Sequence, residues 1–361
     1  MRIEEIRTVI KRAAQTAGFD LCGIAPATDS PELNHFPKWI AAGHAGEMKY
    51  LEARDEQGSL KRASLASVAP WARSVIVCAI NYNTGHPYST QVQEPACGWI
   101  SRYAWSREDY HDAVLRRLKQ VEADLHDATK ETQPDLVTRS YVDTGPIVER
   151  VFAKYAGVGW TGKNTCLINQ GKGSWLFLGV ILTSLELQAD RTAPDRCGTC
   201  TRCIEACPTD AILAPYQLDS NRCIAYLTIE KRGAIPEDLR EGMGHHVFGC
   251  DICQDVCPWN RKAPISAAPE FAPREGLVNP ALDWLAEMSA EEFGQAFRGS
   301  PIRRTKRSGL RRNVAIAMGN SGRTEFLASL ERLASDEDEA VAESARWAAR
   351  RVQKKRKQPS P

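Results

Sequence analysis

Two cysteine stretches, CGTCTRCIEACP at residues 197–208 and CDICQDVCP at residues 250–258, decide how this chain is organised. Thiolates bind iron–sulfur clusters, and a cubane cluster needs four of them. In bacterial two-cluster proteins three come from a tight loop and the fourth from the other motif. A zinc site usually takes two CxxC pairs, which neither stretch supplies. The spacing therefore predicts two [4Fe–4S] clusters.

The second stretch lacks one local ligand, and Cys223 lies 27 positions before Cys250. Pairing by the two-cluster rule gives each cluster four thiols with none left over. Cluster one takes Cys197, Cys200, Cys203 and Cys257, and cluster two takes Cys207, Cys223, Cys250 and Cys253. Such clusters carry single electrons and select no substrate, so the electron acceptor is expected in residues 1–190.

Composition places the chain among cytoplasmic globular proteins. It has 361 residues, 43% hydrophobic and 25% charged, which suits two or three domains. The N-terminal stretch is a charged amphipathic helix with no apolar signal core, and no long uncharged apolar run follows. Twelve cysteines in such a chain indicate metal binding or catalysis rather than disulfides.

The remaining pattern predicts an α+β protein in three parts. Residues 1–190 form an α/β domain, with strands at 74–80, 136–142 and 175–187, a helix at 109–128, and a helix that opens at Pro146 and stops at Gly157. Residues 191–262 form the ferredoxin-like module, and residues 263–361 a linker and helical region. There, 313–319 and 344–350 align at an offset of 31, which suits a HEAT-like repeat or a plain helical bundle.

Two motifs in the first domain resemble known sites. GVGWTGKNT at 157–165 imitates a phosphate-binding loop, but it follows a helix and leads into a strand, the reverse of what nucleotide binding requires. Asp143, in VDTG, has two interpretations. It either turns the chain after a strand or acts as a general acid whose pKa is raised by burial.

Basic residues concentrate near the C-terminus, although the net charge is only +2. The runs at 301–313 and 350–357 are partly balanced by the acidic segment 335–340. A solvated helical face and a nucleic-acid contact both fit this pattern.

The order of SRYAWSREDYH, VDTGPIVER, GVGWTGKN, CGTCTRCIEACPTDAI, RCIAYLT and FGCDICQDVCPWN resembles the epoxyqueuosine reductase family of tRNA-modifying enzymes, which is related to reductive dehalogenases. The resemblance covers nearly the whole chain. It implies a cobalamin in the first domain, reduced through the two clusters. It also implies an activity that converts epoxyqueuosine in the tRNA anticodon loop to queuosine.

The resemblance also assigns residues. Asp143 matches the proton donor, and cofactor contacts fall on Arg62, Ser101, Asp143, Leu167 and Leu178. The tRNA contacts it implies are Lys231, Arg232, Arg303, Arg304, Lys306, Arg307, Arg311 and Arg312. No histidine suits the lower face of the cobalamin, so no protein ligand to the cobalt is expected there.

Two other functions fit parts of the sequence. A corrinoid reductive dehalogenase of small organohalides would share the cofactors, but it would leave the basic runs without a purpose. A non-catalytic iron–sulfur electron carrier would leave Asp143 and the first domain unexplained. The expected partners are tRNA and a low-potential donor of the ferredoxin or flavodoxin type. The chain is expected to act as a monomer, with no membrane.

Overall fold

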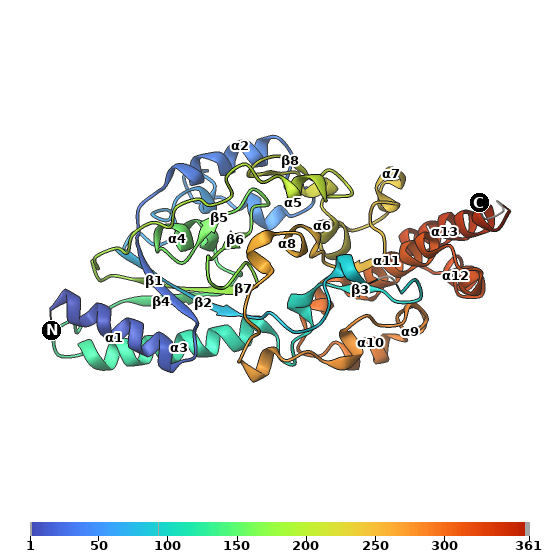
Figure 1. Cartoon of the computed structure of the whole chain (residues 1–361). Helices are drawn as coiled ribbons and strands as arrows, with labels where there is room; N and C mark the ends of the chain where they lie inside the picture. Colours follow the sequence, from blue (N-terminus) through green and yellow to red (C-terminus); the bar gives the residue numbers. More distant parts are fainter. Residues whose placement is uncertain (1, 93, 358–361) are drawn as a thin grey trace.

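The computed structural model of the protein describes residues 2–92 and 94–357, and the side chains of residues 2–92 and 94–354. Figure 1 shows an elongated molecule, with a sheet and its helices at the N-terminal end and a group of helices at the C-terminal end. Within the described residues no helix is both long enough and apolar enough to cross a membrane. Residues 358–361 of the predicted C-terminal region and the side chains of residues 355–357 in its last basic run lie outside this description.

A four-stranded antiparallel sheet forms the centre of the N-terminal part. Its strand order is β1-β2-β7-β4. The strands are β1 (Leu21–Pro26), β2 (Ser74–Asn81), β7 (Leu176–Thr183) and β4 (Thr138–Tyr141). The three predicted strands are confirmed, although β4 and β7 are shorter than the apolar runs that indicated them. Helices and strands are mixed in this part of the chain, as predicted, and every pairing within the sheet is antiparallel.

Helices cover both faces of the sheet, because β2 alternates between two cores. Ile76, Cys78 and Ile80 pack with α1 (Ile3–Thr16) and α3 (Tyr110–Thr129). Their neighbours Val75, Val77 and Ala79 pack with α4 (Glu149–Tyr155) on the other face. Each buried aliphatic side chain of valine or isoleucine size stabilises the fold by about 1.5–3 kcal/mol. A strand that is buried on both faces therefore fixes the position of the loops at its ends.

Helix α4 starts later than predicted. It begins at Glu149, not at Pro146, because the Arg62 side chain holds the preceding turn in a non-helical conformation. The Nη1 of Arg62 donates hydrogen bonds to the carbonyls of Gly145 at 2.6 Å and Ile147 at 3.3 Å. The predicted end is confirmed: Gly157 has φ +73°, and a Cβ there would meet the Arg191 carbonyl at 2.5 Å.

The cysteine-rich part is made of short elements joined by loops. They are α5 (Arg202–Glu205), β8 (Ile212–Ala214), β9 (Gln217–Leu218), α6 (Ile224–Ile229), α7 (Glu237–Arg240), β10 (His246–Phe248) and α8 (Ile252–Asp255). β10 pairs in parallel with β3 (Trp99–Ile100), which comes from the first 190 residues. The remaining short elements are α2 (His35–Ala41) and the hairpin of β5 (Trp160–Thr161) and β6 (Leu167–Ile168).

The C-terminal helices share one core with β3 and β10. They are α9 (Leu282–Glu287), α10 (Ala290–Ala296), α11 (Lys306–Ser321), α12 (Leu327–Leu333) and α13 (Glu339–Lys357). α11 and α13 approach closely, since a Cβ on Gly319 would lie 2.7 Å from that of Ala348. This core crosses the predicted boundary at residue 190. The three-part division and the HEAT-like repeat remain predictions.

Candidate active site

The thiols predicted for cluster one lie together. Cys197 and Cys257 pack in one small core with Trp160, Ile168 and Trp259. Burial is the main reason that the pKa of Cys257 is raised to about 11, and the nearby thiols of Cys197 and Cys203 also raise it. Cys203 in turn is near Cys197 and Cys200. The structure therefore brings a cysteine of the second motif to the three of the first.

The other four thiols form a second group. Burial is the main reason that the pKa of Cys250 is raised, and the nearby thiols of Cys223 and Cys207 also raise it. Cys253 in turn interacts with Cys250 and Cys223. Within the described residues no three His, Cys, Asp or Glu side chains converge closely enough to hold a single metal ion. The thiols gather instead in two sets of four, in the grouping that the two-cluster rule predicts.

The loop that imitates a phosphate-binding motif holds both cysteine loops. Lys163 Nζ donates to the carbonyls of Gly198 at 2.7 Å and Cys200 at 3.0 Å. Its neighbour Asn164 donates from Nδ2 to the Cys253 carbonyl at 3.2 Å. The loop connects β5 to β6, so it lacks the strand-before-helix order that a nucleotide site requires. The lysine and the asparagine fix the two groups of thiols relative to each other.

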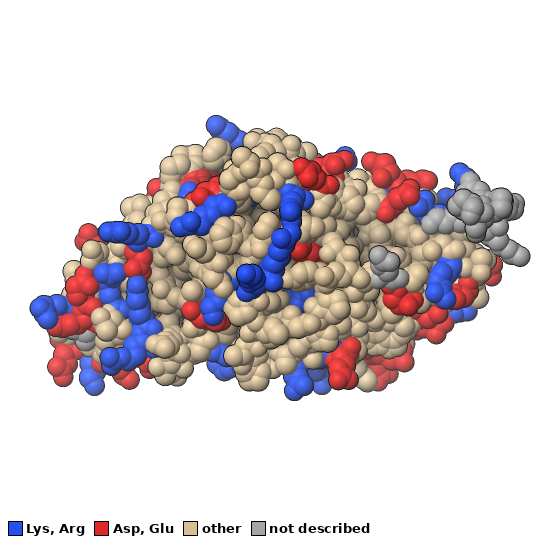
Figure 2. Space-filling model, in the orientation of Figure 1, with Lys and Arg blue, Asp and Glu red and all other residues tan. Residues whose placement is uncertain are grey.

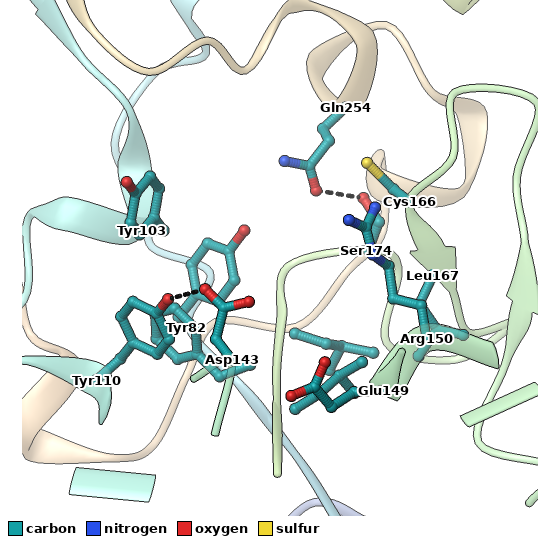
Figure 3. Close-up of a pocket in the computed structure, with 13 residues that line it drawn as sticks. Tyr82, Tyr103, Tyr110, Asp143, Glu149, Arg150, Cys166, Leu167, Ser174 and Gln254 are labelled. Carbon is teal, nitrogen blue, oxygen red and sulfur yellow. Dashed lines mark hydrogen bonds between the residues drawn. The ribbon is translucent and has the colours of Figure 1, made fainter. Parts of the chain in front are cut away.

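An open cavity lies between Tyr110 and Asp143 on one side and Cys166 and Gln254 on the other (Figure 3). Its empty volume is about 790 Å³, including the part open to solvent. Apolar side chains of β6 and β7 and three tyrosines form much of its wall. The lining residues are Tyr82, Tyr103, Tyr110, Asp143, Glu149, Arg150, Cys166, Leu167, Ser174, Leu176, Phe177, Leu178 and Gln254. Cys166 also contacts Cys253, so the cavity reaches the cluster-two thiols.

Asp143 projects into this cavity from the turn after β4. Its φ of +54° is unusual for a residue with a side chain. Oδ2 accepts a hydrogen bond from the Tyr110 hydroxyl at 2.8 Å (Figure 3). The His111 ring, held by Asp109 at 2.7 Å, lies 3.9 Å from the same oxygen. The side chain is 64% exposed, so the burial expected around Asp143 is wrong: the turn presents its carboxylate to the cavity opening.

Glu149 is a second carboxyl group in the wall, and the sequence did not single it out. Its Oε1 is buried and accepts no hydrogen bond from the described residues. Burial, then the charge of Asp143, raise the pKa of Glu149 to about 7, against the opposing effects of Arg62 and Arg150. The cavity wall therefore contains the exposed carboxyl group of Asp143 and the half-buried one of Glu149, of which one oxygen is buried. Figure 3 shows both side chains.

Replacing Glu149 with Gln should remove a pH dependence of stability. Folding raises the pKa of this carboxyl group, so its contribution to stability is fully present below about pH 4.5 and is lost as the pH rises through about 7. We expect Glu149→Gln to be more stable than the natural protein by about 2 kcal/mol at pH 8, and equal to it at about pH 4. Urea unfolding at several pH values measures this difference. Glu131→Gln, at an exposed position, serves as the control, and a pH-independent difference for Glu149→Gln would contradict the account.

The predicted cofactor contacts fall in three places. Asp143, Leu167 and Leu178 line the cavity. Ser101 is buried beside the second group of thiols, where its hydroxyl donates to Asp251 Oδ1 at 2.5 Å. Arg62 holds the turn behind Asp143 through Gly145 and Ile147.

The predicted tRNA contacts also separate into groups. Arg232, Arg303, Arg304 and Lys306 are exposed. Arg307 and Arg311 are half-buried and donate to carbonyls near α9, and Arg311 also pairs with Asp336. Lys231 pairs with Glu47. On the face shown in Figure 2, Lys and Arg side chains cross the middle, whereas Asp and Glu gather over the C-terminal helices.

The contact predicted for Arg312 is wrong. This side chain is 2% exposed, and its guanidinium donates to the carbonyls of Lys231, Gly233 and Leu227 at 2.7–2.8 Å. The sequence shows that position 312 carries a positive charge but not which way the side chain points. In the structure Arg312 points inward and connects α11 to the loop after α6.

Replacing Arg312 with Met should therefore destabilise the fold instead of weakening RNA binding directly. Three carbonyls around the buried guanidinium would lose their donor, which costs about 3–5 kcal/mol in free energy of unfolding. Arg303→Met, at an exposed position of the same run, should change stability by less than about 0.5 kcal/mol. Denaturant unfolding of both variants measures this, and equal stability of the two would contradict the assignment.

Comparison with known proteins gives consistent matches. Residues 62–144 match the family model described as "Epoxyqueuosine reductase QueG, DUF1730", and residues 196–260 match a 4Fe-4S double cluster binding domain. Epoxyqueuosine reductase of Synechocystis sp. is 45% identical, with 81% of this chain and 98% of the relative covered. That of Xanthomonas campestris is 39% identical, with 94% of each covered.

Solved structures agree over the same length. An epoxyqueuosine reductase crystal structure superposes with a TM-score of 0.85 at 28% identity, covering 97% of this chain and 91% of the other. A second, with the same values, holds a tyrosine tRNA stem loop modified with epoxyqueuosine. A third, from Bacillus subtilis, has its catalytic aspartate loop swung out of the active site, with a TM-score of 0.84 at 27% identity over 97% of this chain and 91% of that one.

Proposed function

This chain belongs to the epoxyqueuosine reductase family, and we propose that it reduces epoxyqueuosine in the anticodon loop of tRNA to queuosine at the Asp143 cavity. It is an oxidoreductase with a double [4Fe–4S] module. The observation that supports the proposal is the cavity, which is lined by Asp143 from the turn after β4 and by Cys166, a contact of Cys253.

Electrons enter through the two clusters and leave toward the cavity. Cluster-two ligand Cys253 contacts Cys166, which lines the cavity, and Gln254 lines it directly. Gln254 accepts from the Ser174 hydroxyl at 2.8 Å, so this wall is held in place. The path from thiols to cavity is thus formed by adjacent residues, and a low-potential ferredoxin or flavodoxin is the donor class that suits it.

The cavity suits a cobalamin as the electron acceptor. A corrin is a broad, largely apolar ring with amide groups at its edge. The side chains of Leu167, Leu176 and Leu178 in the cavity wall can contact the apolar face of such a ring. The unpartnered oxygen of Glu149 is the kind of acceptor that an amide N–H satisfies. When bound, cobalamin supplies a strongly reducing, nucleophilic cobalt centre. Asp143, Leu167 and Leu178 would hold it, with Arg62 and Ser101 at the edges.

Asp143 supplies the proton that the reaction needs. Removing an epoxide oxygen breaks two C–O bonds and consumes two electrons and two protons, leaving an alkene and water. The alkoxide that forms when the first C–O bond breaks is a poor leaving group until it is protonated. Tyr110 orients the carboxyl group through its 2.8 Å hydrogen bond, and Arg62 holds the turn that carries it. The exposed position of Asp143 allows it to regain a proton from solvent.

The tRNA would lie across the exposed cations beside the cavity opening. Arg232, Arg303, Arg304 and Lys306 can contact phosphates, which position the RNA while the cavity reads the modified base. An anticodon loop allows a single nucleotide to be turned out of its stack into a pocket. The chain would act as a monomer, with α11–α13 as a HEAT-like support for this surface.

Expression in cells that lack their own epoxyqueuosine reductase tests this function. We expect their tRNA to change from epoxyqueuosine to queuosine when this chain is produced, as measured by mass spectrometry of the digested nucleosides. Persistence of epoxyqueuosine with the protein present and its clusters intact would contradict the proposal.

A further inference from the structure

Tyr50 is an aromatic side chain with an exposed ring outside the cavity. It lies in a short 3₁₀ helix, Lys49–Glu52, and 47% of it is exposed. Burial of the remainder, with Glu230 and Asp143 nearby, raises the pKa of its hydroxyl, which therefore stays protonated. The reaction described above makes no use of this ring.

Two arginines flank the ring. The guanidinium carbon of Arg304 lies 5.3 Å from the ring centroid, and that of Arg62 lies 5.9 Å from it. Both distances allow a cation–π interaction. A half-exposed aromatic ring beside two guanidinium groups offers both a stacking surface and positive charge.

Arg62 connects this group to the catalytic turn. The same side chain that faces Tyr50 donates to the carbonyls of Gly145 and Ile147, directly after Asp143. Arg62 therefore links Tyr50 to the turn that carries Asp143, and the charge of Asp143 is near enough to Tyr50 to contribute to its raised pKa.

Arg304 is held in place from the other side. Its Nε pairs with Glu230 at 2.5 Å, and Arg232 donates to its carbonyl at 2.9 Å. The ion pair neutralises Glu230, which is one of the two carboxylates that raise the pKa of Tyr50, so Glu230 does not repel a phosphate that approaches the ring. A cation that is already ordered loses little conformational freedom when a ligand binds.

We propose that Tyr50, Arg62 and Arg304 form a stacking platform for the nucleotide that flanks epoxyqueuosine in the anticodon loop. This inference rests on the proposed function, and it identifies the rim of the same site as a base-binding surface. A base that leaves its stack next to an inserted nucleotide loses a neighbour, and an aromatic ring or an arginine plane replaces it. The two guanidinium groups pair with the phosphates on either side.

Binding of a stem loop measures the platform separately from turnover. The probe is an RNA anticodon stem loop carrying epoxyqueuosine, with the fluorescent base 2-aminopurine placed either directly before or directly after it. Affinity and fluorescence are recorded for the natural protein, Tyr50→Ala, Tyr50→Trp and the control Trp284→Ala. Trp284 is a similarly exposed aromatic residue, at 43%, on α9.

We expect the natural protein to quench one of the two labelled positions, because stacking quenches 2-aminopurine. Tyr50→Ala should lose that quenching and bind about 5- to 100-fold more weakly. Tyr50→Trp should keep both properties, and Trp284→Ala should match the natural protein. Unchanged affinity and quenching in Tyr50→Ala, while the natural protein binds and converts the stem loop, would overturn the platform alone. If the natural protein neither binds nor converts it, the proposed function falls first and the platform with it.

Discussion

Asp143→Asn should keep both clusters and bound cobalamin but lose turnover by about 10²- to 10⁴-fold, the usual contribution of a positioned acid. The amide has nearly the same shape and can still accept the Tyr110 hydrogen bond, so the cavity should be preserved. What it cannot do is deliver a proton to the oxygen that leaves the epoxide. Iron content, the cobalamin absorption spectrum and the rate of queuosine formation measure the three properties on one preparation.

Two further variants separate acid chemistry from damage to the site. Asp143→Glu keeps a transferable proton and should recover part of the rate. Asp135→Asn, at an exposed position before β4, should have the rate of the natural protein. Turnover by Asp143→Asn at the rate of the Asp135→Asn control would remove the acid role from Asp143.

The second large effect concerns which thiols share a cluster. If Cys257 belongs to the first cluster, Cys197→Ala combined with Cys257→Ala destroys one cluster and leaves the other. The protein should then keep about half of its iron and sulfide. Combining Cys250→Ala with Cys257→Ala takes one ligand from each cluster, so both should be lost. Each pair removes two thiols, which makes them matched controls for each other.

Iron and acid-labile sulfide analysis of anaerobically purified protein distinguishes the two pairs. Queuosine formation should fall to background in both, because one cluster cannot complete the path to the cavity. A grouping by sequence proximity would instead place Cys250 and Cys257 in the same cluster. Loss of both clusters in the first pair and of only one in the second would therefore contradict the assignment.

Sequence spacing predicted the features that are local in the chain. The strand at 74–80 is confirmed because its β-branched residues are buried on both faces, and the end at Gly157 is confirmed because that position needs a positive φ. The thiols could be grouped because the two-cluster rule links the motifs through a known geometry. That grouping remains a prediction about the ligands, although the structure brings the same thiols together.

Features that depend on distant contacts could not be predicted from the sequence. The start of α4 depends on Arg62, which lies 83 positions before the carbonyl of Gly145 that it binds. Arg312 is indistinguishable in sequence from its exposed neighbours until α11 packs against the loop after α6. Glu149 follows Asp143 in an unremarkable helix start, and only the fold shows that one of its oxygens is buried in the cavity wall. His111 lies beside Asp143, with its Nε2 3.9 Å from Oδ2, although the two residues belong to different elements.

The most direct test of the central claim is an anaerobic reaction with purified components. The protein with both clusters is incubated with cobalamin, a low-potential reductant and tRNA that carries epoxyqueuosine, and the nucleosides are then analysed by mass spectrometry. We predict that the modified nucleoside loses one oxygen atom, and that omitting cobalamin or the reductant abolishes this loss. An unchanged nucleoside, with cobalamin bound and both clusters intact, would contradict the account.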